Sequence, residues 1–231
     1  MIRILLVDDH AVVRTGYRRL LDAEPDLKVV AEAATADEAY ARVCEQALDV
    51  AVVDLGLPGA SGLEAIRRML GREPGLRVLV FSMYNNPSFA TQAMRLGAVG
   101  YLTKSSEPGE MIEAIREVSC GRRVLSPEIA QILARGLLDQ YNGLDCLTPR
   151  EFEVLRLSAR GDSVSSVAGR MHLSPKTIVN YLSMIRQKLQ VENDFELLHL
   201  AARHGLVELD DGATRPLPRK DAGALCQSRG F

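Results

Sequence analysis

The first half of the chain alternates short apolar runs with longer amphipathic segments. Apolar runs rich in β-branched residues predict five strands, at residues 2–7, 28–33, 50–54, 77–82 and 99–102. Between and after them, apolar residues at helical spacing predict helices at residues 12–24, 36–46, 62–71, 87–96 and 108–120. Strands that alternate with helices imply right-handed crossovers and a parallel sheet covered on both faces. We therefore expect a five-stranded, parallel, doubly wound α/β domain over residues 1–121.

Local signals support several of these elements. Thr35 and Ser61 each stand three residues before a glutamate, which is the pattern of a capping box. Pro87 and Pro108 suit the first position of a helix. The run Val50–Val53 has no polar alternation, which is typical of a central strand buried on both sides.

Beyond residue 121 the pattern changes, and no further strand is predicted. A helical stretch at residues 127–138 is followed by the breaker-rich QYNGLD, so we interpret residues 122–146 as a linker. Helical periodicity then returns at residues 149–159, 164–171, 175–190 and 194–204. Thr148 and Ser174 each precede a proline, a combination that begins helices. We expect an all-α domain of four helices over residues 147–207, then a mobile tail over residues 208–231.

Composition adds limits on the class of protein. The 231 residues are 47% hydrophobic and 25% charged, as in ordinary soluble proteins. No apolar run is long enough to cross a bilayer, and no leader precedes the first strand, so we expect a cytoplasmic protein. The four cysteines form no CxxC pair, which argues against a zinc site or a disulfide framework. Residues 1–120 hold 13 Lys/Arg and 17 Asp/Glu, so their net charge is negative, whereas residues 121–231 hold 15 and 13, so theirs is positive. This difference in charge favours two domains with different partners.

Polar side chains follow four of the predicted strands. Asp8 and Asp9 come after the first strand, Asp54 after the third, Ser82 after the fourth and Lys104 after the fifth. Because the carboxyl ends of parallel strands meet at one edge of the sheet, these side chains are expected to lie together. Three carboxylates there repel one another unless a cation lies among them, and Mg²⁺ suits such oxygen ligands.

A carboxylate beside such an ion can attack a phosphoryl group, because the metal and a lysine neutralise the charge on its oxygens. Asp54 is the candidate nucleophile and phosphoacceptor, and Ser82 and Lys104 are placed to receive the phosphoryl oxygens. The candidate metal ligands are Asp8, Asp9, Asp54 and the backbone carbonyl of Gly56. Any one of these residues alone could simply cap a strand end, but together they favour a site.

Four segments together resemble the receiver domain of two-component response regulators: IRILLVDDHAVVRTGYRRLL, DLGLPGASGLEAIR, FSMYNNP and GAVGYLTKS. The resemblance implies that Asp54 accepts phosphate from a sensor histidine kinase, with Mg²⁺ required. It also implies that Ser82 moves toward phosphorylated Asp54 while Tyr101 rotates inward as its switch partner. Tyr101 could instead be an aromatic that fills the edge of the core. Met83 stands where the family has a small residue, so we expect narrower access for small phosphodonors.

The segment CLTPREFEVLRLSARGDSVSSVAGRMHLSPKTIVNYLSMIRQKLQVENDFELLHLA resembles the LuxR-type helix-turn-helix domain. With the receiver ahead of it, the chain resembles a response regulator of the NarL/FixJ type. On the helix at 175–190, Ile178 and Ile185 recur at helical spacing and should face the core, which leaves the opposite face for a DNA groove. The candidate DNA-binding residues are Lys176, Thr177, Val179, Asn180, Ser183, Gln187 and Lys188.

Some positions depart from the family pattern. Val179, Ser165 and Ser166 stand where the family commonly has charged residues, and lost lysines reduce the salt-dependent part of DNA affinity. Base contacts remain available, since Asn180 can pair with adenine and Val179 can pack on a thymine methyl. Between residues 148 and 190 there are 7 Lys/Arg and 3 Asp/Glu, which is modest for a DNA-binding domain. We therefore expect phosphorylation-promoted homodimers to hold double-stranded DNA better than monomers do.

These patterns predict a DNA-binding transcription regulator, not an enzyme. One alternative is a regulator that acts through protein contacts, with a helical domain repurposed for docking. Another is a phosphate sink whose C-terminal domain is inert. An aspartyl phosphohydrolase typically needs Asp-x-Asp and a longer chain, which the adjacent Asp8 and Asp9 do not match.

Overall fold

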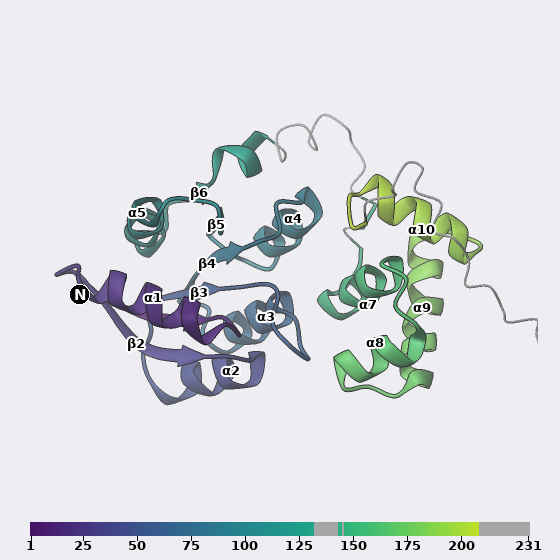
Figure 1. Cartoon of the computed structure of the whole chain (residues 1–231), viewed down its shortest axis with the longest axis horizontal. Helices are drawn as coiled ribbons and strands as arrows, with labels where there is room; N and C mark the ends of the chain where they lie inside the picture. Colours follow the sequence, from purple (N-terminus) through teal and green to yellow (C-terminus); the bar gives the residue numbers. More distant parts are fainter. Residues whose placement is uncertain (132–142, 145, 208–231) are drawn as a thin grey trace, which may run out of the picture.

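The computed structural model describes residues 1–131, 143–144 and 146–207, which form an α/β domain followed by a helical domain (Figure 1). The predicted tail at residues 208–231 lies outside the described residues. Residues 127–131 begin the helix predicted at 127–138, and the rest of that stretch is also outside the described residues. None of the helices in the described ranges is long and apolar enough to cross a membrane.

The α/β domain is built on one parallel sheet with the strand order β2-β1-β3-β4-β5-β6. The five predicted strands are confirmed as β1 (Ile2–Val7), β2 (Leu27–Ala33), β3 (Val50–Val53), β4 (Arg77–Ser82) and β5 (Gly100–Thr103). A sixth strand, β6 (Val124–Leu125), was not predicted, because two apolar residues are too few to show a period. It extends the sheet beyond β5, within the segment interpreted as a linker.

Helices cover both faces of this sheet. Alternate residues of each strand face opposite sides, so Ile4 and Leu6 belong to one apolar cluster and Leu5 and Val7 to the other. The first cluster includes α1 (Ala11–Asp22) and α5 (Pro108–Ser119). The second includes α2 (Ala36–Glu45), α3 (Gly62–Arg72) and α4 (Pro87–Arg95). The doubly wound arrangement predicted from the sequence is confirmed.

The helix starts follow the predicted signals with one exception. Thr35 accepts a hydrogen bond from the backbone of Glu38, and Pro87 and Pro108 occupy first helical positions. The capping box predicted at Ser61 is wrong, because its side chain makes no capping bond. Its partner Glu64 is instead engaged by arginine side chains, described below.

The helical domain contains α7 (Pro149–Ala159), α8 (Val164–Met171), α9 (Pro175–Leu189) and α10 (Asp194–Arg203), each within a residue of its predicted bounds. Thr148 and Glu151 form a reciprocal capping box at the start of α7, as predicted. His172 ends α8 in the left-handed conformation (φ 53°) and turns the chain sharply into α9. The pair α8–α9 therefore forms the predicted helix-turn-helix.

The two domains pack against each other through α3 and α4 on one side and α7 on the other. Phe89 of α4 meets Phe152 of α7 edge-on, with 5.1 Å between ring centroids, and the buried apolar cluster runs through this pair without a break. Asn86 and Ser88 donate side-chain hydrogen bonds to the backbone carbonyl of His204, both at 3.1 Å. Arg150 lies 3.9 Å from Glu64, which also pairs with Arg67 of its own helix. Docking thus uses α7, the residues after α10 and His172 at the end of α8.

Candidate functional site

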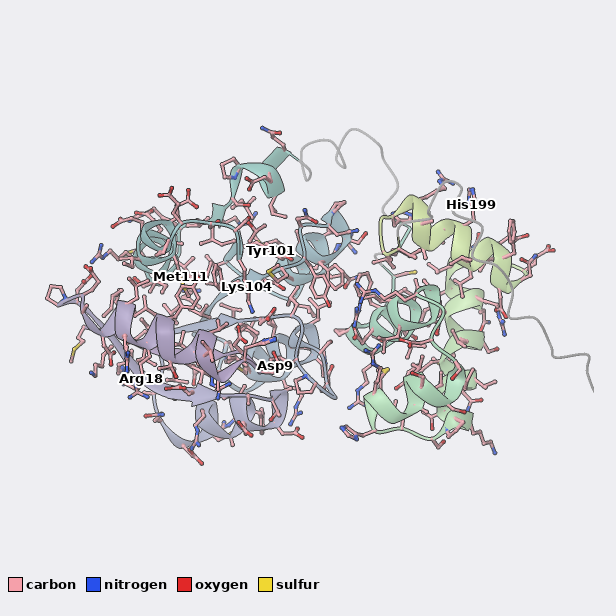
Figure 2. The ribbon with its side chains drawn as sticks, viewed as in Figure 1. Asp9, Arg18, Tyr101, Lys104, Met111 and His199 are labelled. Atoms are coloured by element: carbon pink, nitrogen blue, oxygen red, sulfur yellow. The ribbon has the colours of Figure 1, made fainter. Side chains whose placement is uncertain are left out.

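The carboxyl ends of β1, β3, β4 and β5 bring together five predicted side chains, which we call the receiver rim: Asp8, Asp9, Asp54, Ser82 and Lys104. Figure 2 shows Asp9 and Lys104 on the side of the sheet that is turned toward the helical domain. Asp8 and Asp54 are each 6% exposed. Carboxylate and imidazole ligand atoms of Asp8, Asp9, His10 and Asp54 all lie within 4.8 Å of one another. The sheet therefore concentrates negative charge at one point.

Lys104 is the cation inside this cluster. Its ammonium lies 2.6 Å from Asp8 Oδ2 and 2.5 Å from Asp54 Oδ2. Burial acts to lower the pKa of Lys104, but the hydrogen bonds to Asp54 and Asp8 outweigh burial and raise its pKa. The lysine therefore stays charged next to Asp54.

Three carboxylates and one lysine leave a formal charge of −2, which one divalent cation neutralises. Oxygen donors of this kind are those that Mg²⁺ prefers. The donor set of the receiver rim therefore fits the predicted ion. The backbone of Gly56 lies next to these carboxylates, since its N–H donates to Asp54 Oδ1 at 3.1 Å.

The two predicted switch residues contact Asp54 and the loop after β4. Ser82 donates a hydrogen bond to Asp54 Oδ1 at 2.7 Å and is fully buried. Tyr101 is also fully buried, and its hydroxyl donates to the backbone carbonyl of Tyr84 at 2.7 Å. Burial, and then the charge of Asp54, raise the pKa of Tyr101, so its hydroxyl keeps the proton it donates. Both side chains lie in the inward positions that the family resemblance assigns to the phosphorylated form.

Gly62 fixes the backbone that carries Asp54. A Cβ atom at this residue would lie 2.1 Å from the carbonyl oxygen of Asp54, far inside van der Waals contact. The amide of Gly62 also donates to the Leu55 carbonyl at 3.1 Å. Only glycine allows the start of α3 to press against the strand end in this way.

The second candidate region is the outer face of α9, which we define by Lys176, Val179, Asn180, Ser183, Gln187 and Lys188. Ile178 and Ile185 are buried, as predicted, and Val179 is 50% exposed. All six residues of the outer face are exposed, so the docked receiver leaves this face open. Figure 1 shows α9 on the far side of α7 and α8 from the sheet.

Two of the predicted DNA-binding residues are engaged within the protein. Lys188 forms an ion pair of 2.6 Å with Glu151, inside the capping box of α7. Thr177 contacts the Ser174 hydroxyl at 2.8 Å at the start of α9. Contact of Lys188 with a phosphate would compete with its ion pair.

Sequence reasoning missed three residues at these regions. His10 follows Asp9 directly, and its Nδ1 lies 2.8 Å from Asp9 Oδ1. Met184 is 47% exposed beside the outer face of α9, four residues after Asn180, so helical spacing could have found it. Tyr84 stacks on Phe89 at 4.4 Å and lies beneath Arg156 of α7, 5.5 Å from its guanidinium. Its role depends on docking between domains, which no local pattern shows.

Comparison with known families agrees with this architecture. Residues 4–116 match the response regulator receiver domain, and residues 145–201 match the bacterial regulatory proteins of the luxR family. Response regulator GacA of Pseudomonas aeruginosa is 39% identical over 211 residues, which covers 90% of this chain and 99% of that protein. Response regulator UvrY of Escherichia coli is 35% identical over 209 residues, with 89% and 96% covered.

Solved structures also match the chain over both of its domains. RcsB of Salmonella enterica serovar Typhimurium, bound to a promoter in the presence of the phosphomimetic BeF₃⁻, is 27% identical, with a TM-score of 0.63 over 87% of this chain and 98% of that chain. Another neighbour contains two RcsB dimers bound to two parallel DNAs (26% identity, TM-score 0.56, 87% of this chain and 98% of that chain covered). On these matches, the chain belongs to the NarL/FixJ family of two-component response regulators, with a receiver domain and a LuxR-type helix-turn-helix domain.

Proposed function

We propose that the protein is a transcription regulator that binds double-stranded DNA and is controlled by phosphorylation of Asp54 from a sensor histidine kinase. The observation that carries this proposal is the position of Asp54, whose carboxylate contacts both Lys104 and Ser82 amid two further aspartates. The named relatives are response regulators, so the role is that of a regulator rather than an enzyme. Because its target is chromosomal DNA, the protein acts in the cytoplasm.

Each side chain of the receiver rim has a task in phosphoryl transfer. Asp8, Asp9, Asp54 and the backbone carbonyl of Gly56 hold Mg²⁺. When bound, the ion neutralises the charge on the phosphoryl oxygens. Lys104 supplies a second positive charge, and the hydroxyl of Ser82 donates to a phosphoryl oxygen.

Phosphorylation is transmitted through the contacts of Tyr101. Its hydroxyl holds the loop at Tyr84, and Tyr84 stacks on Phe89, which meets Phe152 of α7. A phosphoryl group that holds Ser82 and Tyr101 in their inward positions therefore biases how α4 and α7 pack. The outer face of α9 is already open in the docked form, so phosphorylation does not need to uncover it. Phosphorylation instead changes how two copies of the protein pair on adjacent half-sites.

DNA contact falls to the exposed residues of α9. Asn180 reads adenine, Val179 packs on a thymine methyl, and Lys176 meets a phosphate. The modest charge of this helix makes the homodimer the form that retains DNA.

A mobility shift with the full-length protein tests the proposal. A pool of promoter fragments is incubated at low salt with Mg²⁺, with and without beryllofluoride. We expect the protein to retain DNA fragments, and beryllofluoride to increase this retention. In the matched control Asp54→Asn, beryllofluoride should no longer increase the retention of DNA. Absence of retention in both states would favour the protein-contact or phosphate-sink alternatives.

A further inference from the structure

A cleft of about 410 Å³ lies between the two domains and reaches Asp9 of the receiver rim, a size that admits a small ligand. The receiver side is formed by Asp9, by the loop Gly56–Gly59 and by Tyr84. The opposite side is formed by residues of α7 and of the end of α8, among them Arg156, Arg160, Arg170 and His172. We call this space the interdomain cleft.

The helical domain closely approaches the loop after β3. Gly59 has a positive φ of 73°, and a Cβ atom there would lie 3.1 Å from Cδ2 of the His172 ring. The end of α8 therefore lies directly against the loop that follows Asp54. A molecule that reaches Asp54 from this side must pass between the two domains.

The far wall of the interdomain cleft carries an excess of positive charge. Arg156 is balanced by Glu153, and Arg170 pairs with Asp162 at 2.8 Å while it still lines the cleft. Arg160 is exposed and has no ion pair or hydrogen bond among the described residues. An anion in the cleft would meet arginines on one side and, on the other, Asp9 and Gly56, which belong to the proposed metal site next to Asp54.

We propose that Arg160 and Arg170 of the helical domain complete a binding site for a small dianionic phosphodonor in front of Asp54. The inference rests on the proposed phosphorylation of Asp54. An aspartyl phosphate is itself an acyl phosphate, so a donor of equal transfer potential is required, and acetyl phosphate is such a donor. Met83 does not line the cleft, and its side chain is 74% exposed, so it leaves this route open.

The reaction balances without a further reactant. A carboxylate oxygen of Asp54 forms a bond to phosphorus while the bond from phosphorus to the acyl oxygen breaks. The acyl carboxylate leaves with the electron pair, and no proton is transferred. Arg160 and Arg170 lie outside the reacting atoms, so they position the donor and contribute to its affinity, not to the bond-making step.

The experiment uses the full-length protein with Mg²⁺ and measures initial rates of phosphorylation on phosphate-affinity gels. The donors are acetyl phosphate, which is a dianion at neutral pH, and phosphoramidate, which carries less net negative charge. For the double variant Arg160→Gln/Arg170→Gln, we expect KM for acetyl phosphate to rise about fivefold with an unchanged rate at saturation. KM for phosphoramidate should change less than about twofold, because fewer charge contacts are lost.

Matched variants separate charge from folding. Arg160→Lys/Arg170→Lys keeps both charges and should restore most of the affinity. Arg123→Gln/Arg203→Gln removes two exposed arginines that do not line the cleft and should behave as wild type. Equal KM values in wild type and the Arg160/Arg170 glutamine variant, or equal rises for both donors, would overturn the cross-domain site. No labelling of wild type by either donor would instead refute phosphorylation of Asp54.

Discussion

Asp54 and the outer face of α9 differ in how the protein surrounds them. Asp54 is buried and bonded to Ser82, Lys104 and the Gly56 amide. Val179, Asn180 and Ser183 are exposed and make no side-chain hydrogen bond within the described residues. The receiver rim is thus preorganised before any partner arrives, whereas these side chains of α9 remain free for the DNA contacts proposed above.

This difference separates two sources of specificity. At the receiver rim, a displaced side chain loses several bonds at once, so substitutions should act strongly and through structure. On the outer face of α9, we expect a substitution to change the energy of a contact with DNA and to leave the fold intact. Substitutions in both regions should therefore differ in the size of their effects.

Gly62→Ala should disturb the receiver rim most. The new Cβ would lie 2.1 Å from the carbonyl oxygen of Asp54, and this backbone atom cannot rotate away as a side chain could. The free energy of unfolding should therefore fall by about 3 kcal/mol or more. Gly71→Ala in the same helix meets nothing within 4 Å and should stay within about 1 kcal/mol of wild type. Urea unfolding measures both. Equal stability of the two variants would show that the start of α3 does not fix Asp54.

Asn86→Asp tests whether docking couples the two regions. The carboxylate can still cap α4 by accepting from Ser88, but it cannot donate to the carbonyl of His204, and it repels that oxygen. We expect docking to weaken by about 1–3 kcal/mol, and small-angle scattering should show a larger radius of gyration. Asn85→Asp adds the same charge at an exposed neighbour and should leave the radius unchanged.

Val179→Lys should strengthen DNA binding without regard to sequence. One more phosphate contact steepens the slope of log K against log salt by about 1, as a titration of mobility shifts between low and physiological salt would show. Val12→Lys adds the same charge on α1, where the side chain is 86% exposed, and should not change the slope. A flat response of Val179→Lys would mean that this position faces neither groove nor phosphates.

The smallest effect concerns the pH dependence of unfolding. Burial acts to raise the pKa of Glu151, but hydrogen bonds from Lys188 and Thr148 outweigh it and lower its pKa below the ordinary 4.5. Its stabilisation is therefore complete above about pH 4.5 and lost as pH falls toward the folded pKa. Glu151→Gln should flatten the fall in stability below that pH in urea titrations. An unchanged slope would show that the ion pair with Lys188 contributes nothing.

The sequence predicted the receiver rim well because parallel strands deliver their ends to one edge. Asp8, Asp54 and Lys104 are far apart along the chain, yet their position after a strand suffices to bring them together. Thr148 was predicted correctly as a capping box and Ser61 was not, although both have a glutamate three residues later. After Ser61 the glutamate, Glu64, instead forms ion pairs with two arginines, one of them from the other domain.

Contacts between domains account for most of what sequence patterns could not show. The contact of the Arg156 guanidinium with the Tyr84 ring and the approach of His172 to Gly59 join residues of the two different domains. Periodicity reports which face of a helix is buried, but not which element covers it. The ion pair of Lys188 with Glu151 of α7 was missed for the same reason. The position of Lys188 on α9 predicted a contact with DNA, but it does not show which neighbouring helix the side chain meets.

The uninterrupted apolar cluster through Phe89 and Phe152 constrains how this protein can be rebuilt. A chimera joined at the end of the linker would replace α7 by a foreign helix. Phe89 of α4 would then lose its contact with Phe152 and become exposed to water. Exchange of DNA specificity is therefore better done by grafting the solvent-facing positions of α9 alone. The protein that receives the grafted positions then keeps its own α7, and with it the surface against which its receiver domain packs.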